Sequence, residues 1–264
     1  MEEENKKIES ETENEEAPIT ESKGKDVSGS EAPKSAFEEW IPKTELGRKV
    51  KNGGILDINT VLDEGKKIKE TEIVDILISD LETDLLLIGQ AKGKFGGGKR
   101  RVFRQTQKKT KEGNKPHFMT LAVTGNKNGF IGIGSGKAKE TVPAREKAYR
   151  KAKLNIIKIR RGCGSWQCGC KSGHSIPFKV RGKCGSVEIE LIPAPKGTGL
   201  MAEKECQKIL RLAGITDIWS RTKGKTTTKI NLVAACFDAL KKLMKTKIKA
   251  EHYDVLGVVG GFQK

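Results

Sequence analysis

Five residues with metal-ligating side chains lie close together in the middle of the chain. Cys163, Cys168, Cys170 and His174 fall within the glycine-rich stretch GCGSWQCGCKSGHS (residues 162–175), and Cys184 follows it. Three thiolates with either His174 or Cys184 as the fourth ligand could hold a structural zinc ion. The spacing is not that of paired C-x2-C motifs, and Cys168 and Cys170 are close for two ligands of one ion. Reduced cysteines packed at a junction between domains are therefore the alternative.

Residues that could catalyse a reaction are not grouped. The histidines (His117, His174 and His252) lie far apart, and most acidic residues belong to the N-terminal segment or to the outer face of a predicted helix. The run GIGSGK (residues 132–137) and the loop at 88–101 resemble phosphate-binding loops, but the P-loop and dinucleotide-binding spacings are not met. A nucleic-acid-processing enzyme would need clustered carboxylates or a histidine-centred site, so the sequence predicts that the chain is not an enzyme.

The charge of the chain is strongly basic and unevenly distributed. The net charge is +17, but the first 35 residues hold ten Glu and one Asp against five Lys. We expect these residues to form a disordered acidic tail, because they cannot bury enough apolar surface to offset ordering entropy. The basic remainder predicts a polyanionic partner, with nucleic acid favoured over an anionic membrane surface because bulky apolar anchors and apolar runs of membrane length are missing.

The stretch from Gly129 to Arg161 has the pattern of a phosphate-binding element. Apolar and glycine residues alternate from Phe130, which predicts a strand, and GSG (residues 134–136) is expected to end it and let the backbone approach RNA. Lys137 and Lys139 then precede a predicted basic helix that starts near Val142 and carries an alanine at every turn. Backbone N–H groups and the helix dipole favour an anion at such a helix start.

Hydrophobic spacing predicts the remaining elements. We expect one amphipathic helix or two short ones between 68 and 87, strands at 102–109, 118–124, 130–135 and 156–159, and a turn with positive φ at 125–129. A second unit is expected to hold strands at 176–181 and 187–191 joined across 182–185, a short strand at 215–219, and basic loops at 193–199 and 221–226. Its two helices should bury Cys206 and Cys236.

These elements predict an α+β fold. A β-β-β-α unit similar to double-stranded-RNA-binding domains would precede a small two-layer αβ domain. The predicted boundaries are a disordered acidic tail at 1–35, an N-terminal extension with helices at 36–87, the RNA-binding-like domain at 88–161, the Cys/Gly-rich junction at 162–175, the C-terminal αβ domain at 176–245 and an irregular basic tail at 246–264.

Several long motifs resemble one family. GNKNGFIGIGSGKAKETVPAREKA, KLNIIKIRRGCGSW, CGSVEIELIPAPKGTGL, LAGITDIWSRTKG and INLVAACFDAL are similar to the small-subunit ribosomal protein family called S-five in bacteria and S-two in eukaryotes. The resemblance runs from about Glu38 to Met244, and the GCGSW–CGC and EEWIPKTELGRKVK segments are similar to archaeal members. It implies a structural constituent of the cytoplasmic small ribosomal subunit that supports subunit assembly and translational accuracy.

The resemblance also implies partners. These are 16S-type rRNA, messenger RNA near the channel through which it enters, and neighbouring proteins of the S-four, S-eight, S-three and S-two (bacterial naming) families, close to the decoding region. The hairpin turn at 111–115 occupies the place of the family's loop toward the head of the subunit, and the loops at 193–199 and 221–225 match those of the family's second domain. A double-stranded-RNA binder that acts alone is the competing interpretation.

Basic side chains in these segments are the predicted RNA contacts. They are Lys99, Arg100, Arg101, Arg104, Lys108, Lys109, Lys111, Lys115, Lys127, Lys137, Lys139, Arg145, Arg150, Lys153, Arg160, Arg161, Arg181, Lys183, Lys196, Arg221, Lys223 and Lys225. Phosphate contacts through so many cations would make binding steeply dependent on salt. We expect no required cofactor apart from the candidate zinc ion.

Overall fold

The structure is a computed structural model that describes residues 40–90 and 100–261. The predicted acidic tail at 1–35 and the predicted RNA contact Lys99 lie outside the described residues.

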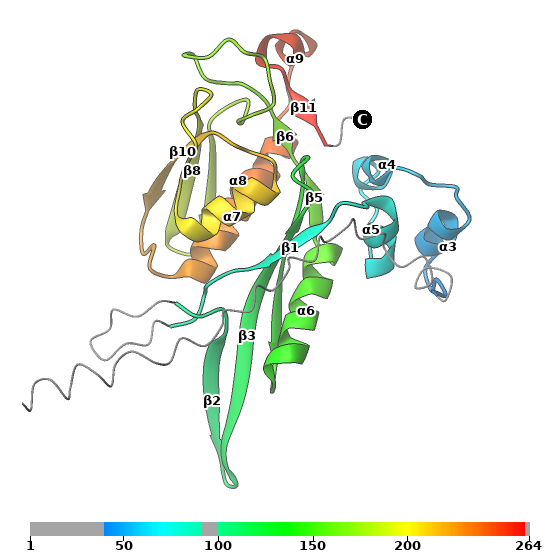
Figure 1. Cartoon of the computed structure of the whole chain (residues 1–264), viewed down its shortest axis with the longest axis vertical. Coiled ribbons are helices and arrows are strands. Elements are labelled where there is room, and N and C mark those ends of the chain that lie inside the picture. The colour runs from blue at the N-terminus through cyan, green and yellow to red at the C-terminus, as the bar shows by residue number, and fades with distance from the viewer. Residues whose placement is uncertain (1–39, 91–99, 262–264) are drawn as a thin grey trace, which may run out of the picture. The chain divides into compact units, whose positions relative to one another are not determined.

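An antiparallel sheet organises the first half of the described chain (Figure 1). Its order is β1-β3-β4-β5, and β2 pairs with the start of the long strand β3. The strands are β1 (Glu82–Leu85), β2 (Arg104–Thr110), β3 (Gly113–Gly125), β4 (Phe130–Ala138) and β5 (Ile156–Lys158). The turn between β3 and β4 contains Lys127 and Gly129 with φ of 57° and 99°, so the predicted positive-φ turn is confirmed.

Helix α6 (Thr141–Leu154) lies directly against β4, and glycine makes this contact possible. A Cβ atom at Gly134 would lie 2.2 Å from the backbone N of Ala152, and one at Gly136 would lie 1.9 Å from the carbonyl O of Ala144. The expectation that residues 134–136 end the strand and open the backbone to RNA is wrong. The strand continues to Ala138, and the glycines let helix and sheet backbones touch.

The opposite face of this sheet is also buried. Leu121 and Val123 lie on either side of Ala122 along β3 and therefore point to the other face. Ala122 packs against the alanines of α6. Leu121 and Val123 belong instead to a core cluster that includes Ile189 and Leu210 from the second half of the chain. Both faces are therefore covered along the second half of β3 and most of β4, which explains why these segments lack the polar alternation of a half-exposed sheet, whereas β2 and the start of β3 are exposed.

The second half forms a sheet of order β7-β8-β10-β9 against two helices. Cys206 and Cys236 are buried in its core, as predicted. The bounds are β7 (Val180–Cys184), β8 (Val187–Pro193), β9 (Leu200–Met201), α7 (Lys204–Leu212), β10 (Ile218–Lys223) and α8 (Lys229–Lys245). The predicted strand at 176–181 starts only at Val180. The predicted strand at 215–219 starts only at Ile218 and runs to Lys223, so residues 221–223, predicted as loop, are strand.

Three short helices precede the first sheet: α3 (Glu45–Lys51), α4 (Ile58–Asp63) and α5 (Thr71–Leu77). They share a core cluster with Phe130 and Ile156. The prediction of helix between 68 and 87 is wrong beyond Leu77, because residues 82–85 pair with β3 as strand β1. The spacing of Leu81 and Leu85 fits a helix, but the strand is selected by a partner some forty residues away in the chain.

The C-terminal segment was predicted to be an irregular basic tail, but its described residues form a helix and a short strand. Helix α9 (Ala250–Leu256) ends at Gly257, whose φ is 54°. Strand β11 (Val259–Gly260) then pairs with β6 (Arg160–Arg161). None of the described helices is both long and apolar enough to cross a membrane.

Candidate RNA interface and Cys/His cluster

The tip of the β2–β3 hairpin carries a first group of predicted contacts. Lys108, Lys109 and Lys111 are exposed and form no ion pair with any described residue. Lys115 is exposed as well and pairs at 2.7 Å with Glu112, which is also exposed. Figure 1 shows this hairpin projecting beyond the rest of the sheet. A ladder of cations on a projecting ribbon can reach a polyanion without disturbing the core.

The start of α6 gathers a second group. Lys137 and Lys139 line a surface depression together with Lys147, His117 and Pro143. The N-cap of α6 is Glu140, which lines the same depression and, within the described chain, makes no side-chain capping hydrogen bond. The N–H groups of Thr141 and Val142 therefore remain available to an anion, whereas Pro143 has no N–H. Arg145 and Arg150 are exposed on the same helix.

Lys147 and His117 were not among the predicted contacts. Lys147 follows Pro143 by four residues, so both lie on one helix face, and this spacing was readable in the sequence. His117 reaches the depression only because β3 pairs with β4 beside it, with Phe118 opposite Ala138. That proximity depends on strand register, which periodicity does not give.

A basic groove lies between the start of β2 and the start of α8. Arg100, Arg101 and Arg104 line it from one side, and Thr227 and Thr228 line it from the other. Thr228 is the N-cap of α8, and within the described part of the chain its side chain accepts no capping hydrogen bond from the backbone N–H groups of the helix. The remaining predicted cations of the second half are exposed as well: Lys196 and Lys225 lie in loops, and Arg221 and Lys223 lie at the end of β10.

Other predicted contacts are held by carboxylates of the same chain. Lys153 pairs with Asp75 of α5 at 2.7 Å, and Lys127 pairs with Glu82 of β1. On β7, Arg181 and Lys183 stand opposite Glu190 and Glu188 in the strand register and pair with them. Cross-strand ion pairs of this kind stabilise a sheet, so these cations have a structural role whether or not they also meet RNA.

Two consecutive arginines on β6 hold backbone carbonyls. Arg160 donates to the carbonyl O of Thr246 at 2.5 Å. Arg161 donates to the carbonyl O atoms of Lys127 and Gly214 at 3.3 and 3.4 Å, and burial lowers its pKa. These bonds join the β3–β4 turn, the end of α7 and the end of α8 to β6. Both arginines therefore position the two halves of the chain.

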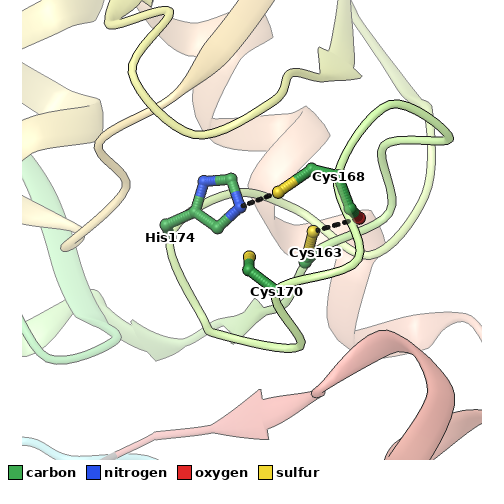
Figure 2. A group of neighbouring side chains, drawn as sticks. All are labelled: Cys163, Cys168, Cys170 and His174. Carbon is green, nitrogen blue, oxygen red and sulfur yellow. Dashed lines mark hydrogen bonds between the residues drawn. The ribbon is translucent and has the colours of Figure 1, made fainter.

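Four candidate metal ligands come together in the junction loop (Figure 2). The Sγ atoms of Cys163, Cys168 and Cys170 and a ring nitrogen of His174 all lie within 4.8 Å of one another. Nε2 of His174 is 3.9 Å from Sγ of Cys168. Of the two candidates for the fourth ligand, the structure brings in His174, and it places Cys184 outside the group, at the end of β7.

The thiols of the cluster differ in environment. Burial, followed by hydrogen bonding to Cys170 and Cys168, raises the pKa of Cys163 to about 11. Hydrogen bonds from Ser172, foremost its hydroxyl, lower the pKa of Cys170 to about 6. Cys170 is exposed and Cys163 is buried, so burial disfavours the thiolate of Cys163 more than that of Cys170.

The imidazole of His174 is held by a buried carboxylate. Nδ1 of His174 lies 2.9 Å from Oδ2 of Asp217, and the two residues are 8% and 4% exposed. Oδ1 of Asp217 accepts hydrogen bonds from the N–H groups of Gly197 and Gly199. Burial alone would raise the pKa of Asp217, but the hydrogen bonds from Gly199, Thr216 and His174 together lower it. The carboxylate therefore fixes the ring with Nε2 toward the thiols.

Comparison with known proteins assigns the family. The family model described as "Ribosomal protein S5, N-terminal domain" matches residues 88–160, and "Ribosomal protein S5, C-terminal domain" matches residues 182–252. The chain belongs to the ribosomal protein S5 family. The first stretch contains β2 to β5 of the first sheet, the second contains the second sheet from Gly182 of β7 onward, and the Cys/His cluster lies in the segment between them.

Curated relatives place the chain among archaeal S5 proteins. "Small ribosomal subunit protein uS5" of Nanoarchaeum equitans is 51% identical over 213 residues, which is 81% of this chain and 91% of that protein. The protein of the same name from Methanocaldococcus jannaschii is 46% identical over 225 residues, or 85% of this chain and 97% of that protein. The S5 chain described here is thus a structural protein of the small ribosomal subunit and a cytoplasmic component, and its relatives are named as ribosomal proteins rather than enzymes.

Proposed function

We propose that this chain binds 16S-type rRNA through exposed cations on its β2–β3 hairpin, at the start of α6 and in its second half. Through this binding it supports assembly of the small subunit and translational accuracy. The observation that carries the proposal is that the centre of the first sheet is covered on both faces, whereas its β2–β3 hairpin is exposed. Exposed cations without carboxylate partners in the described chain then lie at the hairpin tip, at the start of α6 and in the loops of the second half. RNA contact is assigned to these places.

The sequence of elements β2-β3-β4-α6 supports a likeness to double-stranded-RNA-binding domains. In such domains a hairpin and a helix start meet successive grooves, and recognition depends on shape through phosphate and 2′-OH groups. The hairpin tip and the depression around Lys137 and Lys139 are two separate cationic sites on one sheet. The additional strands β1 and β5 extend the sheet without covering either site.

The proposed surroundings follow from the family. We place the chain near the decoding region and near the channel through which messenger RNA enters, with neighbours of the S-four, S-eight, S-three and S-two (bacterial naming) families. The hairpin at 111–115 would point toward the head of the subunit. RNA contact requires no cofactor in this proposal, and the Cys/His cluster has a structural role.

A charge-removal variant tests the proposal. The triple variant K137A/K139A/R145A of the full chain should bind a 16S-type rRNA fragment more weakly than wild type. Each lost phosphate contact reduces the magnitude of the negative slope of log affinity against log salt by about 0.7 to 0.9, so three contacts reduce it by about 2 to 3. Binding is measured by filter retention at several salt concentrations, and the urea midpoint checks that the fold is intact.

The matched control removes the same charge elsewhere. K66A/K208A/K242A takes away three lysines that pair with Glu64, Asp84 and Asp238. It should leave the salt slope within about 0.5 of the wild-type value. The start of α6 does not bind phosphate if K137A/K139A/R145A keeps the wild-type affinity and salt slope. The same conclusion follows if the control variant loses as much affinity and slope as K137A/K139A/R145A.

A further inference from the structure

We propose that Cys163, Cys168, Cys170 and His174 bind one zinc ion, with Asp217 as the carboxylate that positions His174. The four ligands all lie in the junction loop, so the ion closes this loop on itself. Asp217 and the backbone contacts of the loop link the site to the second half of the chain and to the C-terminal helix. The argument depends on donor set, spacing, ring orientation and the contacts of the loop.

The spacing of the donor atoms fits a single ion. A tetrahedron with zinc–sulfur bonds of about 2.3 Å has edges of about 3.8 Å. The Cys168–His174 edge is already 3.9 Å, and every pair in the group lies within 4.8 Å. Iron–sulfur clusters set their ligands around more than one metal and need a wider cage. Three thiolates and one imidazole are soft donors that select zinc over magnesium or calcium.

The loop is folded back on itself in the way a closed site requires. Lys171, between Cys170 and His174, has a φ of 50°, a left-handed conformation that is uncommon outside glycine. The N–H of Cys168 donates to the carbonyl O of Ser165 at 3.2 Å, which makes a turn between the first two cysteines. Cys168 and Cys170 are separated by one residue, a spacing that by itself argues against a shared ion. In the folded loop both sulfur atoms nevertheless lie in the same group of donor atoms.

The buried carboxylate supplies the orientation that a ligating histidine needs. A ring that donates its Nδ1 proton to Asp217 keeps the lone pair on Nε2, the atom nearest to Cys168. Carboxylate–histidine pairs of this kind hold the ring in place and raise its basicity toward a metal. The Asp217 side chain is itself fixed by N–H groups of the 193–199 loop, so the metal centre and that loop share one hydrogen-bond chain.

The junction loop also contacts the C-terminal helix. The N–H of Cys163 donates to the carbonyl O of Leu256 at 2.8 Å. A Cβ atom at Gly257 would lie 1.9 Å from the carbonyl O of Lys171. An ion that holds the loop closed would therefore hold α9 and β11 in place as well, and its binding free energy would add to the stability of this region.

Metal content and cobalt spectra test the site directly. The full chain, purified without chelators and reconstituted with excess zinc, should retain about one zinc ion after gel filtration. Cobalt(II) in place of zinc should give thiolate-to-metal charge transfer and the intense visible bands of a tetrahedral centre. Zinc retained only at trace level, or cobalt spectra of an octahedral aquo ion, would overturn the proposal.

Variants locate the ligands. Cys168→Ser and Cys170→Ser should each weaken zinc binding and reduce the charge-transfer intensity, and the exposed Cys170 site keeps the test usable if Cys168→Ser folds poorly. Cys184→Ser is the matched control, since this cysteine lies outside the group and should leave both readouts unchanged. A loss with Cys184→Ser equal to that with Cys170→Ser would refute the assignment.

The positioning role of Asp217 has its own readout. Asp217→Asn should lower zinc affinity about 10- to 100-fold, measured by competition with a chromophoric chelator. Charge transfer per bound cobalt should stay at the wild-type level, because all three thiolates remain.

Hydrogen exchange tests the link between the ion and the C-terminal segment. Amide exchange at residues 250–260 of the wild-type chain should become faster when the metal is removed by a chelator. Unchanged zinc affinity in Asp217→Asn, or unchanged exchange on chelation, would contradict the linkage.

Discussion

A single added methyl group at Gly134 should destabilise the fold strongly. Its Cβ would lie 2.2 Å from the N of Ala152, 2.4 Å from the O of Ala148 and 2.6 Å from the C of Lys151. All three are backbone atoms of α6, so no side chain can rotate away. Ordinary contact begins near 3.4 Å, and the helix must therefore move by about 1 Å.

The expected cost follows from this displacement. Overpacking a close contact costs about 1–3 kcal/mol, and three simultaneous backbone contacts place Gly134→Ala at the upper end. Replacing glycine also restricts the unfolded chain, which offsets about 0.4–1 kcal/mol. We expect a net loss of about 2 kcal/mol in the free energy of unfolding. Urea titration should show a lower midpoint with an unchanged m-value.

Two comparisons make the reasoning refutable. Gly260→Ala is the control, because the nearest atom to its Cβ is the flexible Cε of Lys158 at 3.6 Å, and its effect should stay within about 0.5 kcal/mol. Ala152→Gly should not rescue Gly134→Ala, since the clash is with backbone and not with the Ala152 methyl. A Gly134→Ala protein as stable as the Gly260→Ala protein, or a rescue by Ala152→Gly, would show that the contact is not the one described.

Two further predictions concern the cores. Glu190 is 3% exposed, and a hydrogen bond from Lys179, assisted by Arg181, holds its pKa below the usual value despite burial. Its stabilisation is complete above the unfolded pKa of about 4.3 and is lost as pH falls through the lower folded pKa. Urea titrations from about pH 6 to pH 3 should show this loss in wild type and a flatter profile in Glu190→Gln, and equal profiles would contradict it. Phe130→Ala should cost about 3–5 kcal/mol, because Phe130 is 1% exposed at the contact with α3–α5. Leu56→Ala, at 80% exposure, should be nearly neutral in the same assay, and similar losses for both would refute this core assignment.

Local signals predicted the elements whose own residues decide their conformation. The helix expected from about Val142 is α6, and the turn at 125–129 has the positive φ that its Gly and Asn residues suggested. The burial of Cys206 and Cys236 followed from helical spacing. Elements selected by distant partners were missed. Strand β1 exists through its pairing with β3, and β11 exists through its pairing with β6.

The sequence by itself determined the basic charge, the absence of an enzyme-type phosphate loop, the family and the supply of soft metal ligands. Tertiary structure decided how these residues are used. It turned Gly134 and Gly136 from a suspected approach to RNA into the contact with α6. It selected His174 over Cys184 as the fourth donor and added Asp217. The physical reason is the same in each case: composition and spacing specify what a side chain can do, whereas partners brought together by strand pairing and packing specify which of these possibilities is realised.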